Sequence, residues 1–299
     1  MAGFTDIRAD GWVARLPGWA RPYALLGRFD RPIGAWLLVL PGFWAFALAA
    51  PGWQQGLTLT ALFVAGAFAM RAAGCVVNDW WDRDIDRQVA RTAGRPLAAG
   101  TVTPAGALGF LALLCAIGLL VLVQLPWVAI LFGAASLLPI ALYPLAKRVT
   151  DYPQAVLGFV FSWAAPTGYA AATSTLDGVA LLLWAAGFCW ILGYDTIYAH
   201  QDRADDARVG VRSTALTFGR RSAWFVGVCY ALTLVLLLAA GLAAGLSGLF
   251  LAGLLLPAGL LARQVWQLDI DDPGLCLTLF RANREAGLSV AAAFLLGRL

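Results

Sequence analysis

The sequence predicts an all-α membrane protein with about nine transmembrane helices, and three observations lead to this fold class. First, 61% of the 299 residues are hydrophobic and 13% are charged, whereas soluble domains average about 45–50% apolar and 25% charged residues. Second, apolar runs close to the ~20 residues that cross a bilayer as a helix recur along the whole chain. Third, the charged residues gather in alternate connections between these runs. We expect a single domain over residues 1–299 with no separate soluble part.

Window hydropathy places nine helices in order along the chain. The third begins at Thr103-Pro104, where threonine suits the N-cap and proline suits the first helical position. The ninth is short and carries Arg281, Arg284 and Glu285 in its first turns. The predicted helices span residues 33–50, 57–77, 105–123, 126–145, 155–173, 179–198, 223–242, 248–262 and 280–296.

The basic residues predict how the chain lies in the membrane. With the N-terminus inside, the basic groups before helix 1 and after helices 2, 4, 6 and 8 all fall on the inner side, and the opposite loops carry no lysine or arginine. The positive-inside rule therefore gives an N-in, C-out topology with residues 1–32 as a cytoplasmic segment. Because the first long apolar run begins only at Ile33, no signal peptide is expected, and a bacterial inner (plasma) membrane is the predicted location. Of the 17 acidic residues only Asp177 is expected outside, so chemistry is expected at the cytoplasmic face.

Two acidic clusters stand at the ends of apolar runs, where carboxylates are costly unless they serve a function. In the first, Asn78, Asp82 and Asp86 are spaced i, i+4, i+8 and share one helix face, which Asp79 borders. In the second, Asp195, Asp202 and Asp206 also share a face. Such ladders of like charge are destabilising alone, and divalent cations offset the repulsion. A donor set of oxygens without cysteine suits Mg²⁺.

The two clusters belong to a weak internal repeat. Helices 2 and 6 each run into an acidic cluster and then a basic loop, four helices apart. Two four-helix-like halves that face each other would bring both clusters to one magnesium–diphosphate site. Lys147 (the only lysine) at the end of helix 4, and Arg71 inside helix 2, add positive charge suited to that ligand.

These residues resemble the signatures of the UbiA superfamily of intramembrane prenyltransferases. The motifs are Asn78-Asp79-x-x-Asp82-x-x-x-Asp86, Tyr143-x-x-x-Lys147 and Asp195-x-x-Tyr198-Ala-x-x-Asp202-x-x-x-Asp206. The segments from Arg28 to Gly34, from Arg71 to Asp79 and from Tyr194 to Ala199 are most similar to the 4-hydroxybenzoate polyprenyltransferase branch. The resemblance covers nearly the whole chain and implies nine helices around a central cavity that opens laterally to lipid.

The resemblance also implies a reaction and a role for each motif residue. A polyprenyl chain would pass from polyprenyl diphosphate to the ring carbon ortho to the hydroxyl of 4-hydroxybenzoate, the membrane step of ubiquinone biosynthesis. Mg²⁺ and cationic side chains would stabilise the departing diphosphate. The expected catalytic residues are Asp82, Asp195 and Asp202, with Asp195 orienting or deprotonating the phenol. The expected metal ligands are Asn78, Asp79, Asp82, Asp86, Asp202 and Asp206, and the expected substrate contacts are Arg71, Asn78, Tyr143, Lys147 and Tyr198.

Several alternatives stay open at this point. The diphosphate motifs are shared across the superfamily, so the acceptor could be a haem, naphthoate or chlorophyllide-type ring. A cation-coupled transporter could use the same carboxylates, although its charges would be expected near the bilayer midplane. Arg71 could pair structurally with an aspartate, and Lys147 could serve only topology. The expected partners are both substrates and the lipid bilayer, with no nucleic acid.

Overall fold

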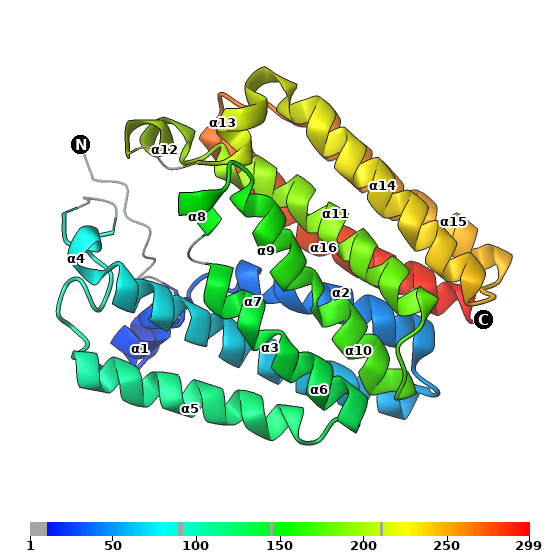
Figure 1. Cartoon of the computed structure of the whole chain (residues 1–299), viewed down its shortest axis with the longest axis horizontal. Coiled ribbons are helices and arrows are strands. Elements are labelled where there is room, and N and C mark those ends of the chain that lie inside the picture. Colours follow the sequence, from blue (N-terminus) through cyan, green and yellow to red (C-terminus); the bar gives the residue numbers. More distant parts are fainter. Residues whose placement is uncertain (1–10, 89–91, 144–145, 210–211) are drawn as a thin grey trace. The chain divides into compact units, whose positions relative to one another are not determined.

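The computed structural model describes residues 11–88, 92–143, 146–209 and 212–299, and within these ranges the chain is helical and has no strand (Figure 1). As far as the described residues reach, which leaves out 144–145 of the fourth range, the nine predicted ranges coincide with helices, two of them with helices that are broken once. The elements are η1 (Val13–Arg15), α1 (Arg21–Leu26), α2 (Ile33–Ala49), α3 (Trp53–Trp81), α4 (Arg83–Asp86), α5 (Pro104–Leu122), α6 (Trp127–Ala135), α7 (Leu137–Leu142), α8 (Ala146–Val149), α9 (Pro153–Ser162), α10 (Ala164–Thr173), α11 (Gly178–Ala199), α12 (Arg203–Val209), α13 (Thr214–Phe218), η3 (Gly219–Arg221), α14 (Ser222–Ala243), α15 (Gly248–Gln267) and α16 (Pro273–Gly297).

Six segments among the described residues are long and apolar enough to cross a membrane, which supports a multi-pass helical membrane protein. The predicted first, fourth and ninth helices are not among them. α2 has 17 residues, the α6–α7 segment Trp127–Leu142 is likewise shorter than 18 residues, and α16 carries three charged residues. Nine spans and the N-in, C-out orientation therefore stay predictions. The six segments are Trp53–Trp81, Pro104–Leu122, Pro153–Thr173, Gly178–Ala199, Thr214–Ala243 and Gly248–Gln267.

Polar caps fix the ends of several helices. The predicted cap of α5 is confirmed, because Gly106 N donates to Thr103 Oγ1 at 3.1 Å and proline follows as the first helical residue. Asp177 caps α11 by accepting from Val179 N at 2.8 Å, and its other oxygen accepts from the Tyr169 hydroxyl at 2.8 Å. The one acidic residue expected on the outer side therefore has a structural task.

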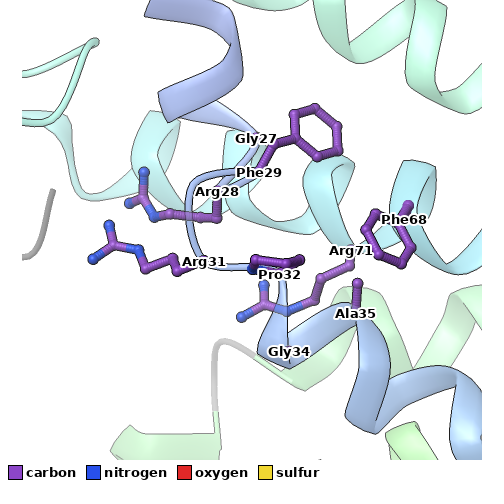
Figure 2. A pocket seen from close by; sticks show the side chains of 9 residues that line it. All are labelled: Gly27, Arg28, Phe29, Arg31, Pro32, Gly34, Ala35, Phe68 and Arg71. Atoms are coloured by element: carbon purple, nitrogen blue, oxygen red, sulfur yellow. The ribbon is translucent and has the colours of Figure 1, made fainter. Parts of the chain in front are cut away.

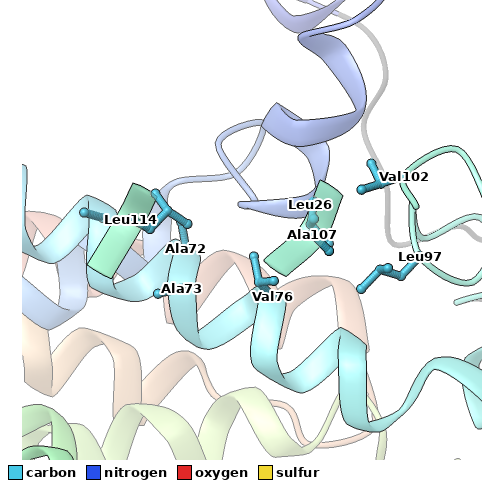
Figure 3. Packing of buried hydrophobic residues seen from close by; sticks show 9 residues of the cluster. Leu26, Ala72, Ala73, Val76, Leu97, Val102, Ala107 and Leu114 are labelled. Carbon is cyan, nitrogen blue, oxygen red and sulfur yellow. The ribbon is translucent and has the colours of Figure 1, made fainter. Parts of the chain in front are cut away.

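The chain forms two compact units. Unit 1 comprises Met1–Trp36 and Leu62–Gln124. Its core lies along one face of α3, where Ala69, Ala72 and Ala73 present almost no side chain and let neighbouring helices pack closely (Figure 3). The remaining buried members of this core are Leu26, Val76, Leu97, Val102, Ala107 and Leu114.

Unit 2 comprises Leu37–Ala61 and Leu125–Leu299, and α11 packs there against α9, α14 and α16. Trp190 of α11 is fully buried and lies 4.9 Å from Trp44 of α2 between ring centroids. Trp44 Nε1 in turn donates to Gly287 O of α16 at 2.8 Å. The end of α2 is fastened by Arg298, whose guanidinium donates to Ala47 O at 3.3 Å and Ala50 O at 2.5 Å.

This division differs from the two four-helix-like halves that the repeat predicts. Most of α2 joins unit 2 through the contacts of Trp44, whereas most of α3 joins unit 1 through its alanine face. The unit that a helix joins depends on the size of the side chains on its packing face. A repeat of charged motifs carries no information about the size of those side chains.

Candidate active site

The first acidic cluster (Asn78, Asp79, Asp82 and Asp86) lies where α3 ends and α4 follows. Asp82 N donates to Asn78 O at 3.0 Å and Asp86 N donates to Asp82 O at 2.8 Å, so the helical period continues across the break. The Asn78 amide donates to Asp82 Oδ2 at 3.2 Å. Asn78 is exposed and Asp82 is half-buried, so the structure brings these two predicted neighbours together on an accessible face.

Asp79 and Asp86 are instead paired with arginines. Asp79 is 1% exposed, and its two oxygens accept from Arg28 Nη2 at 2.8 and 2.9 Å. Arg95 Nη1 donates to Asp79 Oδ1 at 3.3 Å and to the Asp86 oxygens at 3.1 and 3.0 Å. Two cations and two anions thus form a buried network of zero formal charge, which we call the arginine clasp (Arg28, Asp79, Asp86 and Arg95).

The donor chemistry of the first cluster fits Mg²⁺ through part of the predicted ligand set. No three Asp, Glu, His or Cys side chains within the described ranges are gathered closely enough to hold a metal ion. Asn78 and Asp82 nevertheless offer accessible oxygens, and Mg²⁺ usually takes one or two carboxylates and completes its shell with water and substrate phosphates. Asp79 and Asp86 stay predicted ligands whose oxygens are occupied by the clasp in this structure.

Arg71 lies on α3 and is half-buried, and its Nη1 donates to Cys75 Sγ at 2.8 Å. It lines a small pocket in unit 1, together with residues of the connection between α1 and α2. Figure 2 shows the guanidinium groups of Arg28, Arg31 and Arg71 extended toward the same side of this pocket. Two of these cations are balanced by carboxylates, because Arg28 is paired with Asp79 at 2.8 Å and Arg31 lies 3.7 Å from Asp30 Oδ2. The lining residues are Gly27, Arg28, Phe29, Arg31, Pro32, Gly34, Ala35, Phe68 and Arg71.

Gly34 leaves the room that Arg71 occupies. A Cβ atom at this position would lie 2.8 Å from Arg71 Nε, closer than real Cβ contacts come. A larger residue at this position of the Arg28–Gly34 motif would therefore displace the Arg71 side chain from the place it holds here.

The second acidic cluster (Asp195, Asp202 and Asp206, with Tyr198) spans the end of α11 and the start of α12. Its three carboxylates are half-buried. Asp206 N donates to Asp202 O at 2.8 Å, so these two aspartates keep the predicted one-turn spacing. The Tyr198 ring packs on Phe280 with centroids 4.5 Å apart.

The segment that carries Asp202 and Asp206 is fastened on both sides. At the first residue of α12, Arg203 Nη2 donates at 2.6 Å to Asp271 Oδ1. Asp271 lies in the connection between α15 and α16. After α12, Thr214 N donates to the buried Gln154 Oε1 at 2.9 Å, and the Thr214 hydroxyl lies 2.9 Å from the Thr196 hydroxyl. These bonds tie the loop to α9 and α11.

Tyr143 and Lys147 flank residues 144–145, which lie outside the described ranges. Tyr143 ends α7 and is half-buried. Lys147 lies in α8, but its side chain is not part of what the structure describes. Because α8 precedes α9, and the start of α9 holds Thr214 through Gln154, α8 and the second cluster lie at the same end of unit 2. The first cluster belongs to unit 1, so the predicted meeting of both clusters across a diphosphate stays a prediction.

Sequence reasoning missed the partners of Asp79 and Asp86. The sequence patterns place Arg28 in a motif and among the basic residues before helix 1, place Arg95 in the basic loop after helix 2, and pair neither with an aspartate. For Asp79 alone there is a signal, because it lies beside the face that Asn78 and Asp82 share, and a carboxylate that is buried needs a cation.

Comparison with known proteins identifies the family. Residues 38–288 match the UbiA prenyltransferase family. The chain belongs to this family. A relative from Aedes aegypti, named 4-hydroxybenzoate polyprenyltransferase, mitochondrial, is 46% identical over 282 residues, which are 93% of this chain and 64% of the relative. The protein of the same name from Bos taurus is 43% identical and covers 98% of this chain and 80% of its own length. The predicted family and branch are confirmed.

Solved structures of the UbiA family show the same fold. A UbiA homolog from Aeropyrum pernix K1 superposes with a TM-score of 0.71 at 26% identity, covering 88% of this chain and 98% of that one. A UbiA homolog from Archaeoglobus fulgidus bound to GPP and Mg²⁺ superposes with a TM-score of 0.61 at 17% identity, covering 92% of this chain and 99% of that one. The second likeness concerns the fold alone.

The predicted location in a bacterial inner membrane is wrong. The similar family members are named mitochondrial and come from eukaryotes. The prediction relied on the absence of a targeting pattern before Ile33, and charge and hydropathy do not distinguish one energy-coupling membrane from another. The membrane-spanning character of the chain is supported.

Proposed function

We propose that this chain transfers a polyprenyl group from polyprenyl diphosphate to the ring carbon ortho to the hydroxyl of 4-hydroxybenzoate, in ubiquinone biosynthesis. One observation carries the proposal: relatives named 4-hydroxybenzoate polyprenyltransferase match 93–98% of this chain at 41–46% identity. The chain spans 64% of the length of the Aedes aegypti relative. The named relatives favour 4-hydroxybenzoate over the haem, naphthoate and chlorophyllide-type acceptors and over a transporter.

Mg²⁺ is the cofactor that these residues fit. We assign Asn78 and Asp82 of the first cluster and Asp202 and Asp206 of the second to it, because all four offer oxygen donors and lie on exposed or half-buried positions. Mg²⁺ supplies positive charge that neutralises the departing diphosphate. The Archaeoglobus fulgidus homolog that binds GPP and Mg²⁺ supports this assignment by its fold.

The chain's own side chains position and activate the two substrates. Arg71, Tyr143 and Lys147 bind diphosphate oxygens, on which negative charge grows as the allylic carbon–oxygen bond breaks. Asp195 accepts a hydrogen bond from the phenol and draws its proton, so that the ring carbon ortho to the oxygen attacks the allylic carbon. Tyr198, one turn along α11 from Asp195, contacts the acceptor.

The proposed architecture is a single domain with nine spans, N-in and C-out. The active site then faces the side on which the basic loops gather. The polyprenyl tail leaves the central cavity through a lateral opening into lipid, since an apolar chain gains nothing by entering water.

A membrane-fraction assay with 4-hydroxybenzoate, an allylic prenyl diphosphate and Mg²⁺ tests the proposal. We expect prenylated product from the wild type, none with EDTA, and none in Asp82→Asn and Asp202→Asn at the Mg²⁺ concentration that just saturates the wild type. Asp84→Asn is the matched control, because the Asp84 side chain is 71% exposed and pairs only with neighbouring surface arginines among the contacts described. Absence of product with intact diphosphate binding would overturn the acceptor, and absence of both would overturn the function.

A further inference from the structure

The arginine clasp joins three segments of unit 1 that are far apart in sequence. Arg28 lies in the connection between α1 and α2, Asp79 in the last turn of α3, and Arg95 in the connection that leads to α5. Arg28 and Asp79 are 51 positions apart. Both arginine side chains are 13% exposed, and the Asp79 and Asp86 side chains are 1% and 7% exposed. The network is therefore buried, and every member has its opposite charge within hydrogen-bond distance.

Arg28 adopts a backbone conformation that a side chain rarely takes. Its φ angle is +59°, in the left-handed region that non-glycine residues avoid unless the surrounding structure imposes it. Its Nη1 also donates to Leu25 O at 3.1 Å. The turn is thus arranged so that the guanidinium reaches both oxygens of Asp79.

The clasp also holds the connection after the first acidic cluster. Asp86 O accepts from the Thr92 hydroxyl at 3.1 Å, and Ala99 N donates to Arg95 O at 2.8 Å. Asn78 directly precedes Asp79, and Asp82 lies between Asp79 and Asp86. Both remain accessible. Removing Asp79 would leave the buried Arg28 guanidinium without its carboxylate, which is strongly unfavourable, and removing Asp86 would leave Arg95 with Asp79 alone.

We infer that the four acidic-motif residues divide into two pairs with different tasks. Asn78 and Asp82 face the Mg²⁺–diphosphate, whereas Asp79 and Asp86 are positioning residues that grip Arg28 and Arg95 and so fix the end of α3. The metal part of this inference rests on the proposed function. The clasp part does not.

The first experiment is a double-mutant cycle. The stability of each purified variant is measured by thermal unfolding in detergent with EDTA present. The variants are Arg28→Gln, Asp79→Asn and the pair together, with Asp84→Asn as control. Each single variant is expected to lower Tm by about 5–10 °C, because it strands a buried charge. The double variant is expected to lose less than the sum of the two. Additive losses would overturn the clasp. If a single variant does not accumulate in the membrane, Arg28→Lys and Asp79→Glu replace it and are expected to give smaller, still non-additive losses.

The second experiment separates a positioning residue from a metal ligand. Inorganic pyrophosphate with Mg²⁺ is expected to raise the Tm of the wild type, of Asp84→Asn and of the Arg28→Gln/Asp79→Asn double variant, and to leave Asp82→Asn unchanged. Loss of the rise in the double variant, as complete as in Asp82→Asn, would make Asp79 a ligand and overturn the division. If the wild type shows no rise, the proposed metal function fails, and the cycle in EDTA still decides whether the clasp exists.

Discussion

The indole N–H of Trp190 donates to Asn283 Oδ1 at 2.9 Å, which links α16 to the helix that carries Asp195. The bond belongs to a fully buried network. Asn283 Nδ2 donates to Gln264 Oε1 at 2.8 Å, and the Tyr230 hydroxyl donates to the same oxygen at 2.9 Å. Four helices of unit 2 thus share one set of satisfied polar groups.

We expect Asn283→Leu to destabilise the protein by about 2–4 kcal/mol, because it leaves the buried indole N–H of Trp190 without an acceptor and removes one of the two donors to Gln264 Oε1. Thermal unfolding in detergent measures the effect. Gln124→Ala, which removes only an exposed bond to Leu120 O, is the control and should change Tm little. A stable Asn283→Leu variant would mean that water or lipid replaces the network.

We expect Asp195→Asn to reduce kcat by about 10²-fold or more while KM for the prenyl diphosphate stays within a few-fold, because general-base contributions are typically 10²–10⁴. Asp202→Asn should instead raise the Mg²⁺ concentration required for half-maximal rate. Steady-state kinetics with both substrates and Mg²⁺ varied in turn distinguish them. An equal increase of KM for the diphosphate in both variants would contradict separate roles.

The stability of the protein should fall as the pH drops from about 6.5 toward 4. His200 is 3% exposed, and burial, aided by the positive charge of Arg203 and opposed by Asp271, lowers its pKa from 6.5 to about 4. In that interval the unfolded chain binds a proton that the folded one does not, so stability is complete above pH 6.5 and is lost below it, by on the order of 2–3 kcal/mol.

Unfolding of the wild type and of His200→Gln at pH 7.5 and 5.0, with EDTA present, measures the effect of this histidine. Glutamine retains a group that can bond Ser222 Oγ, which lies 2.9 Å from Nε2. The wild type is expected to lose more stability than the variant between the two pH values. Parallel losses would assign the pH dependence to other groups.

Replacement of two glycines of α15 by alanine should change the stability of the protein in opposite directions. A Cβ at Gly253 would lie 2.9 Å from Ala293 Cα, a backbone atom of α16 that has little freedom to move, whereas a Cβ at Gly259 meets open space. We expect Gly253→Ala to destabilise by about 1–3 kcal/mol and Gly259→Ala to stabilise by up to about 1 kcal/mol. Tm values of the two variants, measured side by side, check this; equal shifts would mean that α15 and α16 are not in close contact.

Local patterns predicted most of the helices and part of the site. Hydropathy placed each helix because a span must be apolar along its length, and the one-turn spacing of Asn78 and Asp82 predicted their contact because a helix period is local. The breaks at Ser136 and Trp163 were not predicted, since an uninterrupted apolar run continues through both.

Relationships between distant segments could not be predicted in the same way. The spacing of Asp79 places it beside the metal face, yet its burial against Arg28 depends on a turn 51 positions earlier. The two compact units likewise depend on which helix faces carry alanine or tryptophan partners, and window hydropathy does not say which neighbour a helix face meets. The roles of the motif residues in catalysis stay predictions.

Arg298 imposes an order on the making of this protein. Its guanidinium satisfies carbonyl groups at the end of α2, and Ala50 precedes it by 248 positions. A ribosome must therefore add 248 further residues after Ala50 before those carbonyls receive their donor, and until then the end of this early helix has to be satisfied by water or by the insertion machinery. Closure of unit 2 at the end of α2 thus has to wait until α16 has been synthesised.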